Sequence, residues 1–371
     1  MAAGVSCKDL SKANPHKHAR AKGSVLAAET SRGGTADTWH AYLQLITVFA
    51  PLWLILENSD ELVHDEVTDW GRILTALHSR GYRCKTLVMD TAEFSLPQHR
   101  GRAYLVAVLC RHRSHDIRDF EQFHTTFTSY VASQRRIPPS VLDVLLPNDD
   151  ERVDAALHQW EQHEPALLQG GTCDAHFATV RQRRRSPLVM SYGRLKCRDS
   201  TAASRWFAPM NQRMKEVLAE QQADTKHVPQ IMLHDVSQSM NRCPRSSPLI
   251  DHPDVLIAPA ILPNSDVWIT MPEPGAASVT QVHRNITEDR FLLPDEYLLL
   301  QGWPLEGSPV KLSEHPGAVK QSFAGHAFSS SVVAAVCCAL MASVTWSEAC
   351  IDQDSGDSED AYAAVELLKT L

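Results

Sequence analysis

Apolar positions in the first 110 residues alternate between helical and strand-like spacing. Helical spacing predicts one helix over 38–48 and a second over 66–79. The apolar runs 52–56, 82–89 and 102–110 have the length of strands rather than of helices. The order strand, helix, strand predicts an α/β fold with a parallel sheet. The pattern leaves open whether the last strand is parallel or antiparallel.

Beyond residue 110 this pattern breaks up, and proline-rich stretches interrupt it as far as residue 290. Five further helices are predicted within and after this region, at 140–146, 150–161, 211–222, 294–300 and 329–344. The C-terminal segment is acidic, and its stretch 352–360 is typical of a disordered linker. These changes predict four parts, which are 1–110, 111–290, 291–345 and 346–371.

Composition narrows the class of protein. A chain of 371 residues with 43% hydrophobic residues can bury a core. No apolar stretch reaches the roughly 18 residues of a membrane span, and the N-terminus lacks the layout of a secretory signal. We therefore expect a nuclear protein, or alternatively a cytoplasmic one, without membrane contact. The nine cysteines include no Cys-x-x-Cys pair, so no metal site is predicted.

Charge is distributed unevenly along the chain. The formal net charge of -8 argues against non-specific binding to nucleic acid, which depends on Lys and Arg. Residues 181–205 nevertheless hold eight basic side chains and a single acidic one. Such a patch suits a surface that faces DNA, and it suits a solvated loop or a localisation signal almost equally well.

Polar side chains with a chemical role are expected where two of the predicted strands begin or end. Gln98, Arg100 and Arg102 alternate along a segment that leads into the third apolar run. Alternate side chains of a strand point to one face, so these three would converge on one site that suits phosphates and base carbonyls. Glu57 and Asn58 follow the first apolar run, and ligands of α/β sheets gather at that edge.

These blocks, together with Cys7 in a loop of small and polar residues, occur in an order that resembles the DNA cytosine-5 methyltransferase family. That family has a Pro-Cys-Gln loop, a Glu-Asn-Val strand end and a Gln-x-Arg-x-Arg segment. After a variable region it has a Leu-Gln-Gly-Phe-Pro block and a Gly-Asn-Ala helix start. The corresponding residues here are Cys7 with Ser11, Glu57 with Asn58, Gln98 with Arg100 and Arg102, Gln301 to Pro304, and Gly325 with His326 and Ala327.

The resemblance implies a role for each of these residues. The Cys7 thiolate would attack C6 of a flipped cytosine, so that C5 can accept a methyl group. Glu57 would hold N3 and the exocyclic amine, and Arg102 would reach the base carbonyl. The remaining residues would bind the substrate or lie near the cofactor pocket. The implied substrate-binding residues are Ser11, Asn58, Gln98 and Arg100, and those near the cofactor pocket are His326 and Ala327.

The resemblance also implies a fold and a cofactor. The fold would be a partial Rossmann-like methyltransferase sheet with an inserted, irregular target-recognition region, and the cofactor would be S-adenosylmethionine. The family's Gly-rich cofactor turn precedes the nucleophile, whereas this chain begins six residues before Cys7 and shows no such turn elsewhere. We therefore expect a sheet that lacks its first half, a chain truncated before the nucleophile loop, and a missing segment or protein partner that supplies the cofactor half.

Three other readings remain open. The chain could be a non-catalytic nucleic-acid-binding or regulatory homologue, which Ser6, Ser59 and His326 favour because each departs from the family pattern. The substrate could be transfer RNA instead of DNA, since a branch of the family methylates it. An unrelated thiol hydrolase that uses Cys7 is the weakest reading, because no histidine has a diagnostic context.

Overall fold

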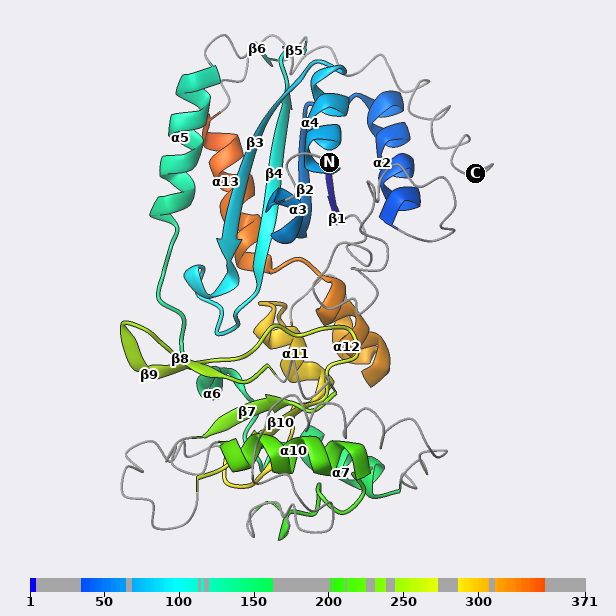
Figure 1. The fold of residues 1–371 in the computed structure, drawn as a ribbon, viewed down its shortest axis with the longest axis vertical. Helices are drawn as coiled ribbons and strands as arrows, with labels where there is room; N and C mark the ends of the chain where they lie inside the picture. Colours follow the sequence, from blue (N-terminus) through cyan, green and yellow to red (C-terminus); the bar gives the residue numbers. More distant parts are fainter. Residues whose placement is uncertain are drawn as a thin grey trace, which may run out of the picture. The chain divides into compact units, whose positions relative to one another are not determined.

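A computed structural model gives the fold in two compact units (Figure 1). Unit 1 comprises Met1–Asp90, Gly101–Arg136 and Ser331–Leu371, and unit 2 comprises Thr91–Arg100 and Ile137–Ser330. Both contain helices and strands, so the predicted α/β class holds in its coarse form, a mixed α/β protein. The structure describes residues 1–4, 35–64, 69–112, 115–116, 120–162, 201, 203–210, 212–224, 231–237, 244–272, 286–306 and 311–343.

A four-stranded sheet forms the centre of unit 1. Its strands are β1 (Ala2–Gly4), β2 (Trp53–Ser59), β4 (Gly101–Leu109) and β3 (Tyr82–Asp90), in the spatial order β1-β2-β4-β3. The three predicted strands are confirmed. β1 and β2 are parallel, whereas β4 is antiparallel to both of its neighbours. β2 and β3, the two strands expected to be parallel, run in the same direction on either side of β4, and the last strand along the chain is the antiparallel one.

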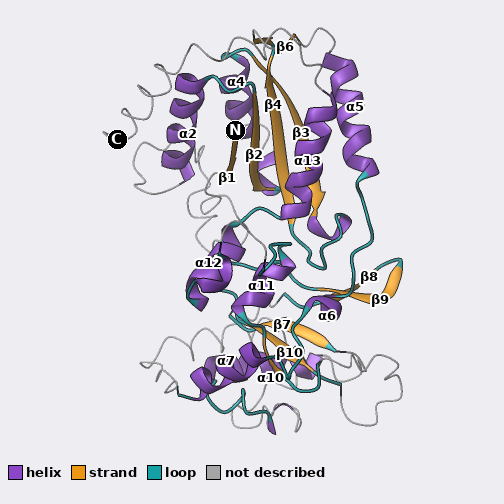
Figure 2. Ribbon diagram, turned by 180° about the vertical axis from the view of Figure 1, so that it is seen from behind, coloured by secondary structure: helices purple, strands orange, loops and turns teal. Residues whose placement is uncertain are grey.

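Helices cover both faces of this sheet, which explains why β2 and β4 are apolar almost throughout. On one face, α2 (Thr35–Phe49) and α4 (Gly71–His78) share a buried apolar cluster with the sheet. On the other face lies α13 (Ser330–Ser343), which Figure 2 shows in front of β3 and β4, with α5 (Phe120–Ser133) beside it. The chain also forms a short helix, α3 (Glu61–His64), and the paired strands β5 (Arg111–His112) and β6 (His115–Asp116).

The predicted helices of unit 1 are confirmed with shifted ends. α2 begins at Thr35, three residues before the expected start, and the segment expected as one helix over 66–79 contains α4. Gly81 ends this segment with a φ of 85°, a backbone conformation that glycine adopts without strain. α5 was not expected, although Phe123 and Phe127 are buried in it at helical spacing.

Unit 2 contains more and shorter elements. Its helices are α6 (Val141–Val144), α7 (Glu151–Glu161), α10 (Gln212–Asp224), α11 (Pro294–Leu300) and α12 (Gly317–His326), with 3₁₀ turns η3 (Thr91–Glu93) and η5 (Leu312–Glu314). Its strands are β7 (Met232–Asp235), β10 (Val267–Thr270) and β11 (Arg290–Phe291) in one antiparallel sheet, and β8 (Ser247–Leu249) with β9 (His252–Ile257) in a hairpin. The four helices predicted here are confirmed, whereas α12 was not expected.

A fully buried ion pair organises the centre of unit 2. Arg290 Nη2 lies 2.8 Å from Glu296 Oε1, and both side chains have an exposed fraction of 0%. Arg290 also donates to the carbonyl oxygens of Leu146 and Phe291, while Glu296 accepts from the amides of Leu146 and Leu293. A buried charge is tolerated when it is paired and hydrogen-bonded in this way. The pair thereby fastens the end of α6 to the start of α11.

No single described helix is long and apolar enough to cross a membrane, and α12 with α13 pass by length and composition only as a bent pair. No group of three or more His, Cys, Asp or Glu side chains within the described ranges is placed to hold a metal ion.

Candidate active site

Glu57 and Arg102 form an ion pair within unit 1. Arg102 Nε lies 3.0 Å from Glu57 Oε1, and the exposed fractions of the two side chains are 15% and 9%. Arg102 Nη1 also donates to the carbonyl oxygen of Gly101 at 2.7 Å, which fixes the direction of the guanidinium group. A carboxylate and a guanidinium that are this well shielded interact more strongly than they would in water. Two of the three residues predicted to be catalytic are therefore adjacent.

The register of the sheet explains this pairing. Glu57 on β2 stands opposite Tyr104 on β4, and Ser59 stands opposite Arg102. Arg102 and Tyr104 are two residues apart, so their side chains lie on the same face of the sheet as that of Glu57. Leu54 and Leu56 belong to the cluster shared with α2 and α4, so Glu57 points to the opposite face. A diagonal cross-strand contact thus brings the two charges together.

Asn58 and Ser59 lie beside Glu57 and are also buried. The Asn58 side-chain oxygen accepts a hydrogen bond from the backbone amide of Ser59 at 2.8 Å. Ser59 Oγ lies 3.4 Å from a carboxylate oxygen of Asp60, within hydrogen-bonding reach. β2 continues to Ser59, so Glu57 and Asn58 are among the last residues of the strand and do not follow it.

Gln98 does not share a strand face with Arg102, because β4 begins only at Gly101. The expected alternation of three side chains along one strand is therefore wrong. Gln98 belongs to unit 2, where it is fully buried and its Oε1 accepts from Gln301 Nε2 at 2.9 Å. Pro97 and His99 on either side pair with the backbone of Ala258. These two hydrogen bonds form an isolated parallel β-bridge between Gln98 and Ala258, separate from β4.

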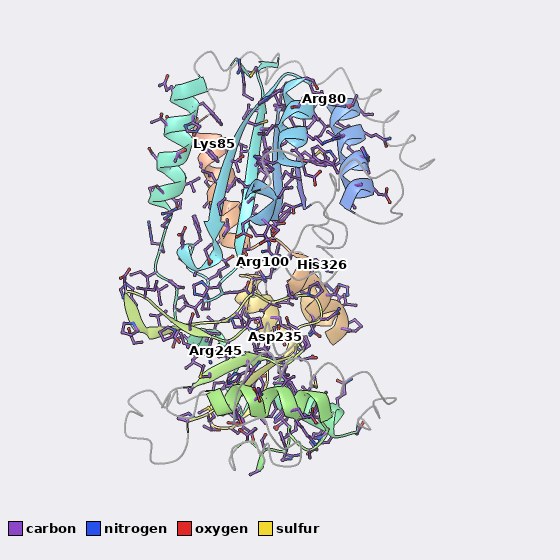
Figure 3. All side chains as sticks on the ribbon, viewed as in Figure 1. Arg80, Lys85, Arg100, Asp235, Arg245 and His326 are labelled. Carbon is purple, nitrogen blue, oxygen red and sulfur yellow. The ribbon has the colours of Figure 1, made fainter. Side chains whose placement is uncertain are left out.

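Arg100 also turns into the interior of unit 2. Its Nη1 donates to the carbonyl oxygens of Ile261 and Gly325, and its Nη2 donates to that of Ala327. Its exposed fraction is only 4%. Figure 3 shows Arg100 beside His326, the residue between two of these acceptors. A guanidinium group offers five N–H donors, and here it satisfies carbonyls at the end of a helix.

His326 and Ala327 mark the end of a helix, not the start that the resemblance implied. His326 is the last residue of α12, is exposed, and its Nδ1 lies 2.9 Å from the carbonyl oxygen of Ser322. Ala327 is the C-cap, with extended backbone angles, and α13 begins only at Ser330. Gly325 is pressed against the backbone of Leu262 and Pro263, where a Cβ atom would not fit.

Two residues that the sequence did not single out join this network. Ser329 Oγ donates to Gln301 Oε1 at 3.0 Å and lies 2.9 Å from Thr91 Oγ1. Thr91 precedes the Gln98 segment, and Ser329 follows α12. The side chains of Thr91, Gln98, Gln301 and Ser329 are all buried. No local pattern marks such a contact, because Thr91 and Ser329 are 238 positions apart.

Cys7 and Ser11 lie outside the described residues, so their predicted roles stay predictions. The described chain leads towards them along β1. Gly4, the last residue of β1, stands opposite Glu57 in the parallel ladder. The sequence then places Cys7 three positions after Gly4.

Residues 1–342 match the family model described as C-5 cytosine-specific DNA methylase. No curated protein matches the chain. The methyltransferase EhMeth of Entamoeba histolytica is similar in structure, with 11% identity, a TM-score of 0.40, and coverage of 92% of this chain and 76% of that one.

Two further solved structures are similar to this chain. The Dnmt2 methyltransferase of S. pombe has 12% identity and a TM-score of 0.41, over 83% of this chain and 74% of that one. A DNMT2 mutant of Spodoptera frugiperda has 12% identity and a TM-score of 0.33, over 81% and 71%.

The protein is a methyltransferase, an enzyme with a mixed α/β fold. Because the matching family model spans residues 1–342, the chain belongs to the C-5 cytosine-specific DNA methylase family. Its reaction is methyl transfer to C5 of cytosine.

Proposed function

We propose that the chain methylates cytosine in DNA and that Cys7, Glu57 and Arg102 are its catalytic residues. The observation that carries this proposal is the shielded Glu57–Arg102 pair in unit 1, with β1 ending opposite Glu57. Cys7 comes three positions after Gly4 in the sequence, and three residues of chain span at most about 11 Å. A nucleophile on this loop is thus tied covalently to the strand beside the acid.

Cys7 would start the reaction. Cytosine C5 is a poor nucleophile, but addition of a thiolate to C6 forms a C–S bond and pushes electron density towards C5. After methylation at C5, loss of the C5 proton and departure of the thiolate from C6 restore the aromatic ring. The target base must leave the duplex to reach these groups.

Glu57 and Arg102 would serve the two polar edges of the base. The Glu57 carboxylate would accept a hydrogen bond from the exocyclic amine and, after taking up a proton from solvent, would pass that proton to N3 as the thiolate adds. Arg102 would donate to the base carbonyl oxygen. Its contacts with Glu57 and Gly101 use Nε and Nη1, and the guanidinium carries two further donors on Nη2. The ion pair would thus hold both groups in place before the base arrives.

Gln98 and Arg100 would contribute indirectly as positioning residues. Their hydrogen bonds go to Gln301 and to main-chain carbonyls inside unit 2. They hold the segment that leads directly into β4, the strand that carries Arg102. Asn58 would likewise hold the backbone at the end of β2. Ser11 would contact the substrate from the Cys7 loop.

S-adenosylmethionine would supply the methyl group, as the family implies. The described residues do not fit it well, because none of them forms a Gly-rich turn between a parallel strand and a helix. Nearby residues of the chain and Arg100 take up the hydrogen bonds of His326 and Ala327, since His326 contacts Ser322 and Ala327 contacts Phe323 and Arg100, and these contacts form no recognisable cofactor cradle. The chemistry proposed above therefore rests on Cys7, Glu57 and Arg102 alone.

We also propose that the described sheet is the second half of a Rossmann-like methyltransferase sheet. The parallel β1–β2 pair followed by an antiparallel last strand supports this, and unit 2 would contain the target-recognition region. No other described strand pairs with the second edge of β1. An edge of this kind can accept a further strand, so a segment or partner protein that carries the cofactor half would add there.

DNA is the proposed substrate because the matching family model describes DNA methylases. Transfer RNA is the alternative, and the nucleus is the proposed location. The choice of substrate and the need for a partner can be tested together with activity. The purified chain, alone and with a candidate partner, would be incubated with radiolabelled S-adenosylmethionine and either duplex DNA or transfer RNA. We expect label in DNA, in alkali-resistant form.

Two variants test the site. Cys7→Ala should abolish transfer, and Glu57→Gln should lower the rate by about 10²- to 10⁴-fold. Cys338→Ala, which changes an exposed thiol on α13, is the matched control and should keep full activity. Full activity of the Cys7 variant would refute the assigned nucleophile, and label only in transfer RNA would refute the assigned substrate.

A further inference from the structure

Unit 1 contains a cavity of about 580 Å³ at one end of its sheet, where α4 leads into β3 and β4 ends. Pockets that bind small molecules usually measure about 300–1,000 Å³, so this one has a suitable size. Leu109 lines it, seven residues along β4 from Arg102, which corresponds to about 23 Å of strand. The cavity is therefore separate from the proposed catalytic residues.

The side chains around this cavity give it a positive charge. His78, Arg80 and Arg83 line it, and the described residues of its lining include no Asp or Glu. A guanidinium group is always protonated in a protein, so the two arginines contribute two fixed positive charges. Like charges around one cavity repel each other until a negative charge comes between them. The lining therefore favours an anion that carries more than one charge.

Both arginines have N–H groups left for such a ligand. Arg80 donates from Nε to Thr47 Oγ1 at 3.0 Å and from Nη1 to the carbonyl oxygen of Ala76 at 2.8 Å, which fixes its position at the end of the sheet (Figure 3). These bonds leave both N–H groups of Nη2. The Arg83 side chain makes no hydrogen bond or ion pair with another described residue, so its five N–H groups remain as well.

The end of α4 does not offset this positive charge. The last carbonyl groups of a helix carry a partial negative charge, which would oppose an anion. Here the carbonyl oxygens of residues 75–78 each accept a hydrogen bond from Ser79, Arg80 or Gly81. One of these donors is the Arg80 guanidinium, which brings a full positive charge to the helix end. The net charge that a ligand meets is therefore positive.

The close grouping of the basic side chains selects the kind of anion. A carboxylate offers two oxygens and one charge, whereas a phosphate group offers three acceptor oxygens and a charge of about -1.5 to -2. Duplex nucleic acid spreads its charge along an axis and is bound by many basic groups, whereas here three of them surround one cavity. We propose that this cavity binds the phosphate chain of a di- or triphosphate, either inorganic or part of a nucleotide.

The test uses the full chain and isothermal titration calorimetry at low ionic strength, without divalent metal ions. The probes are inorganic triphosphate, a nucleoside triphosphate, inorganic phosphate, a hexaglutamate peptide and a short DNA duplex. We expect saturable binding of both triphosphates, weakened by added salt, and about tenfold weaker binding of inorganic phosphate. Tighter binding of the nucleoside triphosphate than of inorganic triphosphate would identify a nucleotide as the source, and equal binding would identify the phosphate chain alone. Tighter binding of the peptide or of the duplex would overturn the proposal.

Substitutions assign the binding to this cavity. Arg83→Gln removes a side chain without a described partner, so it should weaken triphosphate binding about tenfold and leave thermal unfolding unchanged. Arg72→Gln, at an exposed position of α4, is the matched control and should leave binding unchanged. Arg80→Gln should also weaken binding, but it removes the contacts with Thr47 and Ala76 as well.

Absence of triphosphate binding would overturn the proposal. So would binding that Arg83→Gln leaves unchanged, because it would place the ligand elsewhere, for example on the basic stretch 181–205. None of these results depends on methyl transfer.

Discussion

Gln98 Oε1 accepts a hydrogen bond from Gln301 Nε2 at 2.9 Å, although the two residues are 203 positions apart. Each belongs to a different sequence block that resembles the methyltransferase family. Ser329 adds a hydrogen bond to the same Gln301 side chain. Blocks that look like separate ligand-binding motifs in the sequence are thus joined by one buried polar network in unit 2.

The first prediction follows from this network. Gln98→Ala removes the acceptor of a buried amide, so the free energy of unfolding should fall by about 1–3 kcal/mol in chemical denaturation. Gln44→Ala, at an exposed position on α2, should stay within about 0.5 kcal/mol of the parent chain. If Gln98 instead binds substrate directly, its loss would raise KM without lowering stability.

A glycine pair gives a second prediction. A Cβ atom at Gly325 would collide with the backbone of Leu262 and Pro263, which cannot move as a side chain can. Gly325→Ala should therefore destabilise the protein by about 2 kcal/mol or more. Gly317→Ala is the matched control on the same helix, because the nearest atom there is a ring carbon of Pro294 at 3.1 Å. Its effect should remain below about 1 kcal/mol, and equal losses in thermal denaturation would contradict the packing argument.

The Glu57–Arg102 pair predicts non-additive stability changes. Arg102→Ala leaves a shielded carboxylate without its cation and should cost about 1–3 kcal/mol, less than for a fully buried pair. Adding Glu57→Gln should recover part of that loss, because the remaining amide is neutral. A double-mutant cycle measured by urea unfolding gives the coupling, with Arg72→Ala on the exposed face of α4 as control. Strict additivity would mean that the two charges do not interact.

The start of α7 predicts a pH dependence. Asp150 accepts hydrogen bonds from the Arg152 backbone amide and side chain, and the side-chain bond is the main reason why the pKa of this carboxyl is lowered. A lowered pKa in the folded state stabilises the fold above the ordinary value of about 4, and this contribution disappears as the pH falls through the lowered pKa.

Asp150→Asn isolates that contribution, since asparagine also caps helices well. We expect a loss of up to about 1 kcal/mol at pH 7 and a smaller one below pH 4. Thermal unfolding of both proteins across this range would show it. A difference that grows as the pH falls would have the wrong sign.

Thiol reactivity gives a fifth prediction. Burial raises the pKa of Cys84 to about 12, and nearby Cys110 adds to this effect. Cys338 on α13 is exposed. At pH 8, iodoacetamide should therefore label Cys338 well before Cys84, as mapped by mass spectrometry, because the thiolate is the reactive form. Denaturant should remove the difference, and rapid labelling of native Cys84 would refute the burial of this thiol.

Sequence reasoning predicted local structure well where one principle dominated. The apolar run of β4 and the Pro294 start of α11 are unambiguous, and both elements are confirmed. α5 could have been predicted too, from Phe123 and Phe127. Sequence reasoning predicted less where strand register and long-range contacts determine the structure. The direct contact of Glu57 with Arg102 depends on which residues of β2 and β4 stand opposite one another.

The alternation of Gln98, Arg100 and Arg102 shows why the rest could not be predicted. Period-two spacing indicates a shared face only if the segment is a strand. Here the backbone at Gln98 pairs with Ala258, a partner 160 positions away, and the strand begins after Arg100. Tertiary contacts therefore override the local pattern, and two arginines that look equivalent in sequence have different partners.

Each unit is built from separate stretches of the sequence, and this limits how such a protein can evolve by recombination. The chain passes between them at 90/91, 100/101, 136/137 and 330/331. Recombination at two breakpoints could exchange 137–330 as a cassette, but it would leave the ten residues Thr91–Arg100 behind in the host gene. Gln98 and Arg100 of the host would then have to form their hydrogen bonds with the side chains and main-chain carbonyls of a foreign cassette. Replacement of residues 137–330 by gene shuffling should accordingly succeed only between chains that share the segment Thr91–Arg100.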